Sequence, residues 1–165
     1  MMAKAREPIL VLGIGNVLLE DDGVGIELVS RARVAGSHPR IAFVDGGTQG
    51  LALLTLLEGR TAILVLDAVR LEATPGTVHH LPEPLTRSTS SADSAHGIGA
   101  AELLAAASLL GDLPPRVEIV GIEPASTRTG VGLSPAVRLG MAPALEMVER
   151  VLASMLADIA REVPR

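Results

Sequence analysis

The stretch of residues 10–25 constrains the fold of this chain more than any other part of its sequence. An apolar run over residues 9–12 ends in closely spaced glycines, an acidic loop follows, and helical periodicity then begins. A short apolar run with β-branched residues, closed by glycines, is typical of a buried parallel strand, and glycine permits the tight turn after it. The stretch therefore predicts a strand, an acidic loop and a helix. The acids would lie at the carboxyl end of the strand, where open α/β sheets bind their ligands.

A dinucleotide-binding fingerprint is the first alternative for this stretch, and its details argue against it. Gly13 and Gly15 have the required spacing, but Leu18 stands where the third glycine belongs. The acidic side chains of residues 20–22 would repel a pyrophosphate in the same place and would attract a cation. The stretch therefore argues against a nucleotide-binding oxidoreductase.

The rest of the chain alternates between strand and helix patterns. Further strands are expected at residues 41–44, 61–66, 76–81 and 117–122. Helices are expected at residues 22–35, 49–58, 97–110 and 134–160. This alternation predicts an α/β fold, with a single three-layer αβα domain over residues 1–165 and a mostly parallel, roughly five-stranded twisted sheet.

Two helix starts can be assigned from single residues. Asp21 or Asp22 is expected to cap the helix over residues 22–35, because carboxylates are favoured at that end. Ser134 followed by Pro135 predicts the start of the last helix. The sheet-facing stripe of the first helix would contain Val24, Leu28 and Val34.

The composition excludes several classes of protein. Of the 165 residues, 48% are apolar, and Phe43 is the single aromatic side chain, so the core must be aliphatic. The lack of aromatic rings and the net charge of −5 argue against a nucleic-acid partner. Since the chain has no cysteine, disulfides, thiolate metal sites and a cysteine nucleophile are excluded. The first apolar run is too short for a signal or membrane span, so we expect a cytoplasmic protein with no membrane partner.

Polar side chains follow several of the predicted strands at the point where each strand ends. They are Asn16, Asp45, Asp67 and Glu123. In a parallel sheet these ends meet at one edge, and Asp22 would lie at the same edge. His96 follows a loop over residues 82–95 and opens the helix over residues 97–110, where the helix N-terminus favours a neutral imidazole. These residues form the candidate site.

The three strongest candidates also have purely structural interpretations. Asp22 is also a potential helix cap, Asp67 a potential turn residue and His96 a potential surface histidine. A carboxylate directly after a six-residue apolar run is expected to be partly buried and to need a partner. That expectation favours a functional role for Asp67.

The roles of the other polar residues stay open. Asn16 either orders its own loop or belongs to the site, and Asp45 and Glu123 are balanced between turn stabilisation and the site. The remaining histidines are expected to lie outside the site: His38, His79 and His80.

Two carboxylates and one imidazole form a set of nitrogen and oxygen donors. Such a set suits zinc, nickel or a similar divalent ion and leaves coordination positions open for water or substrate. The sequence contains neither the H-E-x-x-H helix of a zinc protease nor the G-x-S-x-G turn of a serine hydrolase. We therefore expect an open cation site formed by Asp22, Asp67 and His96.

A series of short motifs runs through nearly the whole chain in a fixed order. It comprises G-I-G-N at 13–16, D-D-G-V-G at 21–25, V-D-G-G-T at 44–48, L-D-A at 66–68, S-A-H at 94–96, G-I-E-P at 121–124 and L-S-P at 133–135. The ordered set resembles the hydrogenase maturation endopeptidases, which process the large subunit of nickel–iron hydrogenases.

The resemblance implies a three-layer α/β fold and a defined site. The metal-contacting residues of the family correspond here to Asp22, Asp67 and His96, the first of which is Asp in some members and Glu in others. The implied activity is that of a hydrolase, a protease of the aspartyl or metal-assisted type, in which the same three residues would be catalytic. Its substrate would be the nickel-loaded precursor of a hydrogenase large subunit, from which it removes a C-terminal extension. The nickel would arrive with the substrate and serve as the recognition element, so the purified enzyme can be metal-free.

The resemblance leaves the mechanism open. Either the metal polarises the scissile carbonyl or activates water, or a carboxylate such as Asp22 acts as the base. A non-catalytic, nickel-sensing checkpoint or chaperone protein for hydrogenase assembly would use the same residues. Cleavage of a loaded precursor by the purified protein would distinguish these two functions.

Overall fold

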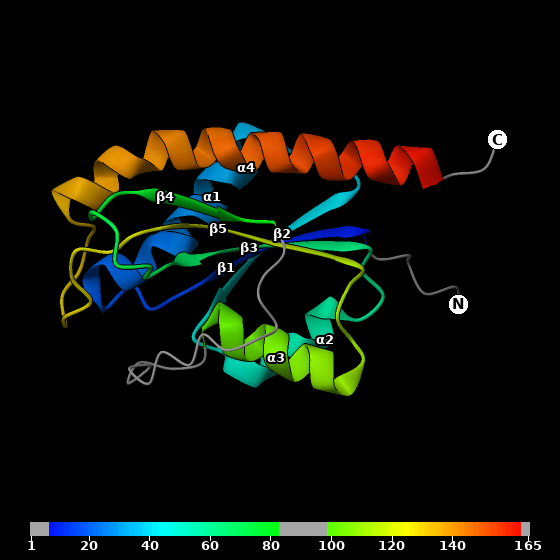
Figure 1. Cartoon of the computed structure of the whole chain (residues 1–165), viewed down its shortest axis with the longest axis horizontal. Coiled ribbons are helices and arrows are strands. Elements are labelled where there is room, and N and C mark those ends of the chain that lie inside the picture. Colours follow the sequence, from blue (N-terminus) through cyan, green and yellow to red (C-terminus); the bar gives the residue numbers. More distant parts are fainter. Residues whose placement is uncertain (1–6, 83–98, 163–165) are drawn as a thin grey trace.

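A five-stranded sheet organises the fold in the computed structural model, which describes residues 7–82 and 99–162 (Figure 1). Its strands are β1 (Ile9–Ile14), β2 (Ile41–Gly47), β3 (Ala62–Ala68), β4 (Val78–Leu81) and β5 (Arg116–Ile122). They lie in the order β2-β1-β3-β5-β4. All neighbours are parallel except the short edge strand β4, which runs antiparallel to β5. The predicted α/β fold with a mostly parallel sheet is therefore confirmed.

Helices cover both faces of this sheet. They are η1 (Glu20–Gly23), α1 (Val24–Ala35), η2 (Gly50–Leu53), α2 (Leu54–Leu57), α3 (Ala100–Leu110) and α4 (Pro135–Glu162), where η denotes a 3₁₀ helix. Figure 1 shows α1 and α4 on one face and α2 and α3 on the other, which gives the three predicted layers. None of these described helices combines the length and the apolar character that crossing a bilayer requires.

Strand β1 contributes to both hydrophobic cores because its side chains alternate between the two faces of the sheet. Ile9 and Val11 join the cluster that contains residues of α1 and α4, whereas Leu10 and Leu12 join the cluster that contains residues of α3. All four side chains are fully buried. Burial on both faces explains why this strand is a continuous apolar run rather than an alternating one.

The α-helix after β1 begins later than the sequence suggests. Neither η1 nor α1 has a side-chain cap, so the expectation that Asp21 or Asp22 caps the helix is wrong. The oxygens of both carboxylates accept hydrogen bonds from amides outside the helix instead. Val24 and Leu28 are buried as expected, but Val34 is 86% exposed. At 3.6 residues per turn Val34 lies about 120° around the helix from Leu28, which turns it away from the sheet.

Single residues determine where two other helices begin. Ser134 caps α4 as predicted, because its Oγ accepts a hydrogen bond from the amide of Val137 at 3.3 Å. The helix expected over residues 49–58 is instead divided between η2 and α2. Gly50, the first residue of η2, has a φ of +57° in the left-handed region, so a regular α-helix cannot continue from Gln49 through Gly50. The helical segment is therefore short and begins as a 3₁₀ turn.

Helix α1 lies very close to the carboxyl ends of β1 and β3. A Cβ atom on Gly25 would lie 2.2 Å from the carbonyl oxygen of Ile14 and 2.3 Å from that of Leu66. A Cβ atom on Gly13 would lie 2.5 Å from the carbonyl oxygen of Gly25. Only glycine allows the backbones to approach this closely. The approach brings the acidic loop that precedes α1 beside the end of β3.

Replacing Gly25 by alanine should destabilise the protein strongly. The new Cβ would collide with two backbone carbonyls, so we expect a loss of at least about 3 kcal/mol, at the upper end of the range for overpacking. Urea unfolding followed by circular dichroism measures this loss.

The matched control for this variant is Gly36→Ala. A Cβ on Gly36 meets nothing within 4 Å, and the extended φ of −163° suits any residue. Its stability should stay within about 0.5 kcal/mol of the wild type. Similar losses in the two variants would contradict the steric explanation.

Candidate active site

Two carboxylates meet at the carboxyl edge of the sheet. Asp67 lies near the end of β3, and Asp22 lies in η1, which packs against β3. Helix α4 begins at the same edge (Figure 1), where the amide of Ser134 bonds to Asp21. The negative charge of Asp22 is close enough to Asp67 to raise its pKa. The structure therefore brings together two of the three predicted site residues.

Asp67 is a buried carboxylate that is only 9% exposed. Its Oδ1 accepts a hydrogen bond from the amide of Ala68 at 2.8 Å, and its Oδ2 accepts one from the amide of Ala100, the first residue of α3, at 3.1 Å. Burial raises the pKa of Asp67 from 3.8 to about 7; the two amides oppose the shift, and the charges of Asp22 and Glu102 add to it. A carboxyl group with this pKa takes up or releases a proton near neutral pH, as a general acid or base must.

Asp22 is half-buried and is held from one side. Its Oδ2 accepts a hydrogen bond from the amide of Asn16 at 2.8 Å. The turn is tight, since a Cβ atom on Gly15 would lie 1.9 Å from the carbonyl oxygen of Asp22, and Gly15 has a φ of +141°. Within the described ranges no donor bonds to Oδ1 of Asp22, so this oxygen can contact water or a substrate.

No positively charged side chain of residues 7–82 or 99–162 forms an ion pair with Asp22 or Asp67. Two like charges in a partly buried site repel each other, and a cation between them would relieve that repulsion. The third predicted ligand, His96, lies outside the described residues, as does most of the loop over residues 82–95. Among the residues that are described, no three His, Asp or Glu side chains gather into a group that could hold a metal ion.

The other polar residues at strand ends have structural contacts. Oδ1 of Asn16 accepts a hydrogen bond from the amide of Leu18 at 2.9 Å, so this side chain orders its own loop. Asp45 is exposed, and its Oδ1 accepts a hydrogen bond from the amide of Gly47 at 2.9 Å. Each of these contacts stabilises a turn. The backbone of Asn16 has a second role, because its amide donates a hydrogen bond to the carboxylate of Asp22.

Glu123 is buried and ties the end of β5 to the connection between β3 and β4. Its Oε2 accepts hydrogen bonds from the amide of Leu71 at 2.9 Å and from Nε2 of His79 at 2.8 Å. Burial alone would raise the pKa of Glu123, but these hydrogen bonds outweigh it and hold the pKa below its ordinary value. Glu123 and His79 therefore satisfy each other.

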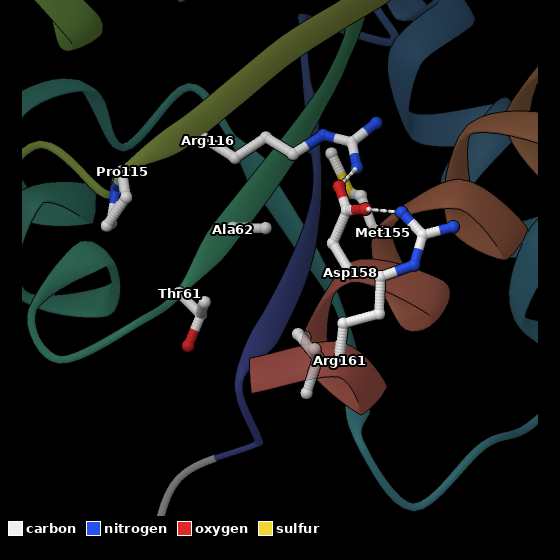
Figure 2. A pocket seen from close by; sticks show the side chains of 8 residues that line it. Thr61, Ala62, Pro115, Arg116, Met155, Asp158 and Arg161 are labelled. Carbon is white, nitrogen blue, oxygen red and sulfur yellow. Dashed lines mark hydrogen bonds and ion pairs between the residues drawn. The ribbon is translucent and has the colours of Figure 1, made fainter. Parts of the chain in front are cut away.

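A hollow lies at the opposite end of the sheet from Asp22 and Asp67. It has a volume of about 360 Å³ and is lined by the first residues of β3 and β5 together with the last turns of α4. Figure 2 shows Asp158 between Arg116 and Arg161, to which it is ion-paired. Arg116 also pairs with the buried Glu118, which bonds to His80 at 2.5 Å. The charges around this hollow are thus neutralised within the fold.

Asp21, which the sequence suggested only as a possible helix cap, is a buried neighbour of Asp22. It is fully buried, and its two oxygens accept hydrogen bonds from the amides of Ala125, Ser126 and Ser134. Burial would raise its pKa, but these amides lower it below the ordinary value. A run of three acids gives no signal of which side chain faces inward, so the sequence could not separate Asp21 from Asp22.

Comparison with known proteins shows which family the chain resembles. Residues 7–151 match the family described as hydrogenase maturation protease. The chain belongs to the hydrogenase maturation protease family. Members of this family are peptidases, and the chain is accordingly a hydrolase that cleaves peptide bonds.

Individual relatives agree with this assignment. The chain is 34% identical over 160 residues to hydrogenase 2 maturation protease of Escherichia coli K12, covering 95% of this chain and 96% of the relative. It is 39% identical over 141 residues to the hydrogenase expression/formation protein HupD of Rhodobacter capsulatus, covering 83% and 67%. The solved structure of the hydrogenase maturating endopeptidase HybD from E. coli superposes with a TM-score of 0.75 at 31% identity, covering 89% and 93%.

The raised pKa of Asp67 predicts a stability contribution that is lost as the pH rises. Because the folded state binds this proton more tightly than the unfolded state, the contribution is complete below pH 3.8 and disappears as the pH approaches about 7. A shift of this size corresponds to about 4 kcal/mol. Between pH 4 and pH 8 the free energy of unfolding in urea should therefore fall more in the wild type than in Asp67→Asn, whose side chain cannot ionise. Parallel pH profiles would contradict the raised pKa.

Proposed function

We propose that the protein is an endopeptidase that removes a C-terminal extension from the nickel-loaded precursor of a nickel–iron hydrogenase large subunit. The observation that carries the proposal is the pair Asp22 and Asp67, which share one edge of the sheet without a cationic partner in the described part of the chain. A substrate that brings its own divalent cation would supply the missing charge. Membership of the family supports both the peptidase reaction and a hydrogenase as its target.

The donor set fits nickel as part of the substrate. Two carboxylate oxygens from Asp22 and Asp67, with the imidazole of His96, offer the oxygen and nitrogen ligands that such an ion accepts, and fewer than a closed set. An ion held there polarises a carbonyl or lowers the pKa of a bound water. Only a loaded precursor would then relieve the repulsion between the two carboxylates, so the protein would distinguish loaded from empty substrate.

The two carboxylates suit different parts of peptide hydrolysis. A water molecule attacks the scissile carbonyl carbon, the C–N bond breaks, and the proton lost by water passes to the leaving amine. Without a bound ion Asp67 has a pKa of about 7 and can exchange a proton near neutral pH, whereas an ion held beside it would lower that pKa and keep Asp67 ionised as a ligand. Asp22 has an oxygen without a donor among the described residues, and this oxygen can orient the water or the substrate.

A processing assay tests the proposal. The purified protein is mixed with the large-subunit precursor from the same source, either loaded with nickel or free of it, and the intact mass of the precursor is followed. Loss of a C-terminal peptide from the loaded precursor alone is the expected result. Cleavage of both forms would overturn the role of nickel, and binding without cleavage of either form would favour the checkpoint function.

Two substitutions should separate folding from activity. Asp67→Asn and His96→Ala are expected to fold but to cleave the loaded precursor about 10²-fold more slowly or not at all, since each removes a group placed to handle the ion or the proton. The rate of precursor loss by mass spectrometry measures the effect, and circular dichroism checks the fold.

Asp112→Asn is the control for these substitutions. It removes one carboxylate from an exposed residue just after α3. This variant should process the precursor at the wild-type rate. Wild-type processing by both Asp67→Asn and His96→Ala would rule out the proposed site.

A further inference from the structure

Asp21 is the one fully buried carboxylate of the described residues, and its partners come from two separate points of the chain. Its Oδ2 accepts hydrogen bonds from the amides of Ala125 at 2.8 Å and Ser126 at 3.1 Å. Its Oδ1 accepts a hydrogen bond from the amide of Ser134 at 2.6 Å. One side chain therefore fastens both ends of the segment 125–134, which connects β5 to α4.

The middle of the same segment is fastened to the residues just before Asp21. The amide of Glu20 donates to the carbonyl oxygen of Gly130, and the amide of Gly130 donates to the carbonyl oxygen of Leu18, each at 2.9 Å. The amide of Asp21 also donates to the carbonyl oxygen of Ser126 at 3.1 Å. Segment 125–134 and the acidic loop thus form one hydrogen-bonded unit.

This unit holds the acidic loop in a conformation that it would not adopt by itself. Glu20 has a φ of +45°, in the left-handed region that residues other than glycine rarely occupy. Such a residue persists only where the surrounding structure fixes it from several sides. Asp22 follows two positions later, and its own side chain has a single hydrogen bond among the described residues, from the amide of Asn16. The position of the Asp22 carboxylate therefore depends on the anchoring of the loop.

We propose that Asp21 is a positioning residue for the peptidase reaction: by fastening segment 125–134 to η1, it holds the carboxylate of Asp22 beside that of Asp67. The inference rests on the proposed function in that it takes Asp22 and Asp67 as the carboxylates that meet the substrate. Asp21 does not contact the substrate itself, because its side chain is fully buried and both its oxygens are occupied.

Asp21→Asn tests the proposal, because the carboxamide keeps the shape of the side chain but offers the three amides one acceptor oxygen instead of two. The kcat and KM for the nickel-loaded precursor are measured together with hydrogen exchange of individual backbone amides. We expect kcat to fall about 10- to 100-fold, as for a small misplacement of a reacting group, while KM changes little. We also expect faster exchange of the Asn16 amide, which reports directly on the position of the Asp22 carboxylate.

Glu118→Gln is the matched control. Glu118 is also a buried carboxylate, but it bonds to His80 and Arg116, near the other end of the sheet. This variant should lose stability while leaving kcat and the exchange of the Asn16 amide as in the wild type. Equal changes in kcat for the two variants would show that general destabilisation, and not positioning, explains the effect.

The result that overturns the proposal is equally specific. If the amides of Ala125 and Ser134 exchange faster in Asp21→Asn while kcat and the Asn16 amide stay unchanged, Asp21 anchors the loop and nothing more. A wild type that fails to cleave the precursor would refute the proposed function, and exchange of the Asn16 amide would still decide whether Asp21 positions Asp22. The two failures are therefore distinguishable.

A second variant decides the matter if Asp21→Asn does not fold. Gly130→Val places a branched side chain against Glu20, since a Cβ on Gly130 would lie 3.0 Å from Cγ of Glu20. Asp21 stays intact in this variant, and faster exchange of the Gly130 amide, which donates to the carbonyl oxygen of Leu18, verifies that the contact between the two segments is loosened. A lower kcat with faster exchange at Asn16 supports the proposal, and wild-type values for both overturn it.

Discussion

The close approach of α1 to the ends of β1 and β3 is the constraint on which the site depends. At Gly25 the helix backbone lies where any side chain would strike the carbonyl oxygens of two strands. A helix held farther from the sheet would carry η1 away from β3 and would separate Asp22 from Asp67. The same contact closes the apolar core beneath α1. The packing that completes this core therefore also brings the two carboxylates together. Packing and function are thus coupled through a few glycine positions.

Burial alone raises the pKa of the acids at this edge, and the hydrogen-bond donors and nearby charges decide the direction of the net shift. Asp21 is fully buried, yet three amides stabilise its charge and lower its pKa. Asp67 has two amides and lies near the charges of Asp22 and Glu102, so its pKa rises to about 7. Two buried acids at the same edge of the sheet therefore have different roles. Asp21 carries a permanent charge that orders backbone, while Asp67 keeps a proton that it can exchange.

The sequence predicted the order of the elements well because the signals were local. Continuous apolar runs marked the strands, and the carboxylates that follow them fall at one edge as expected for Asp22 and Asp67. What it could not predict depends on contacts between distant segments. The burial of Asp21 requires amides that lie more than 100 positions away along the chain, and its two oxygens accept hydrogen bonds from those amides instead of capping the helix. The role of His96 stays a prediction, since it falls outside the described residues.

The antiparallel direction of β4 determines where the chain can accept inserted residues near the site. Because β4 runs back along β5, the connection after β3 stays at the edge where Asp67 lies instead of crossing the sheet. Glu123 fastens this connection at both ends, through its Oε2 to the amide of Leu71 and through its carbonyl oxygen to the amide of Gly76. Residues 72–75 lie between these anchors, so insertions there would lengthen the border of the site without shifting the register of any strand.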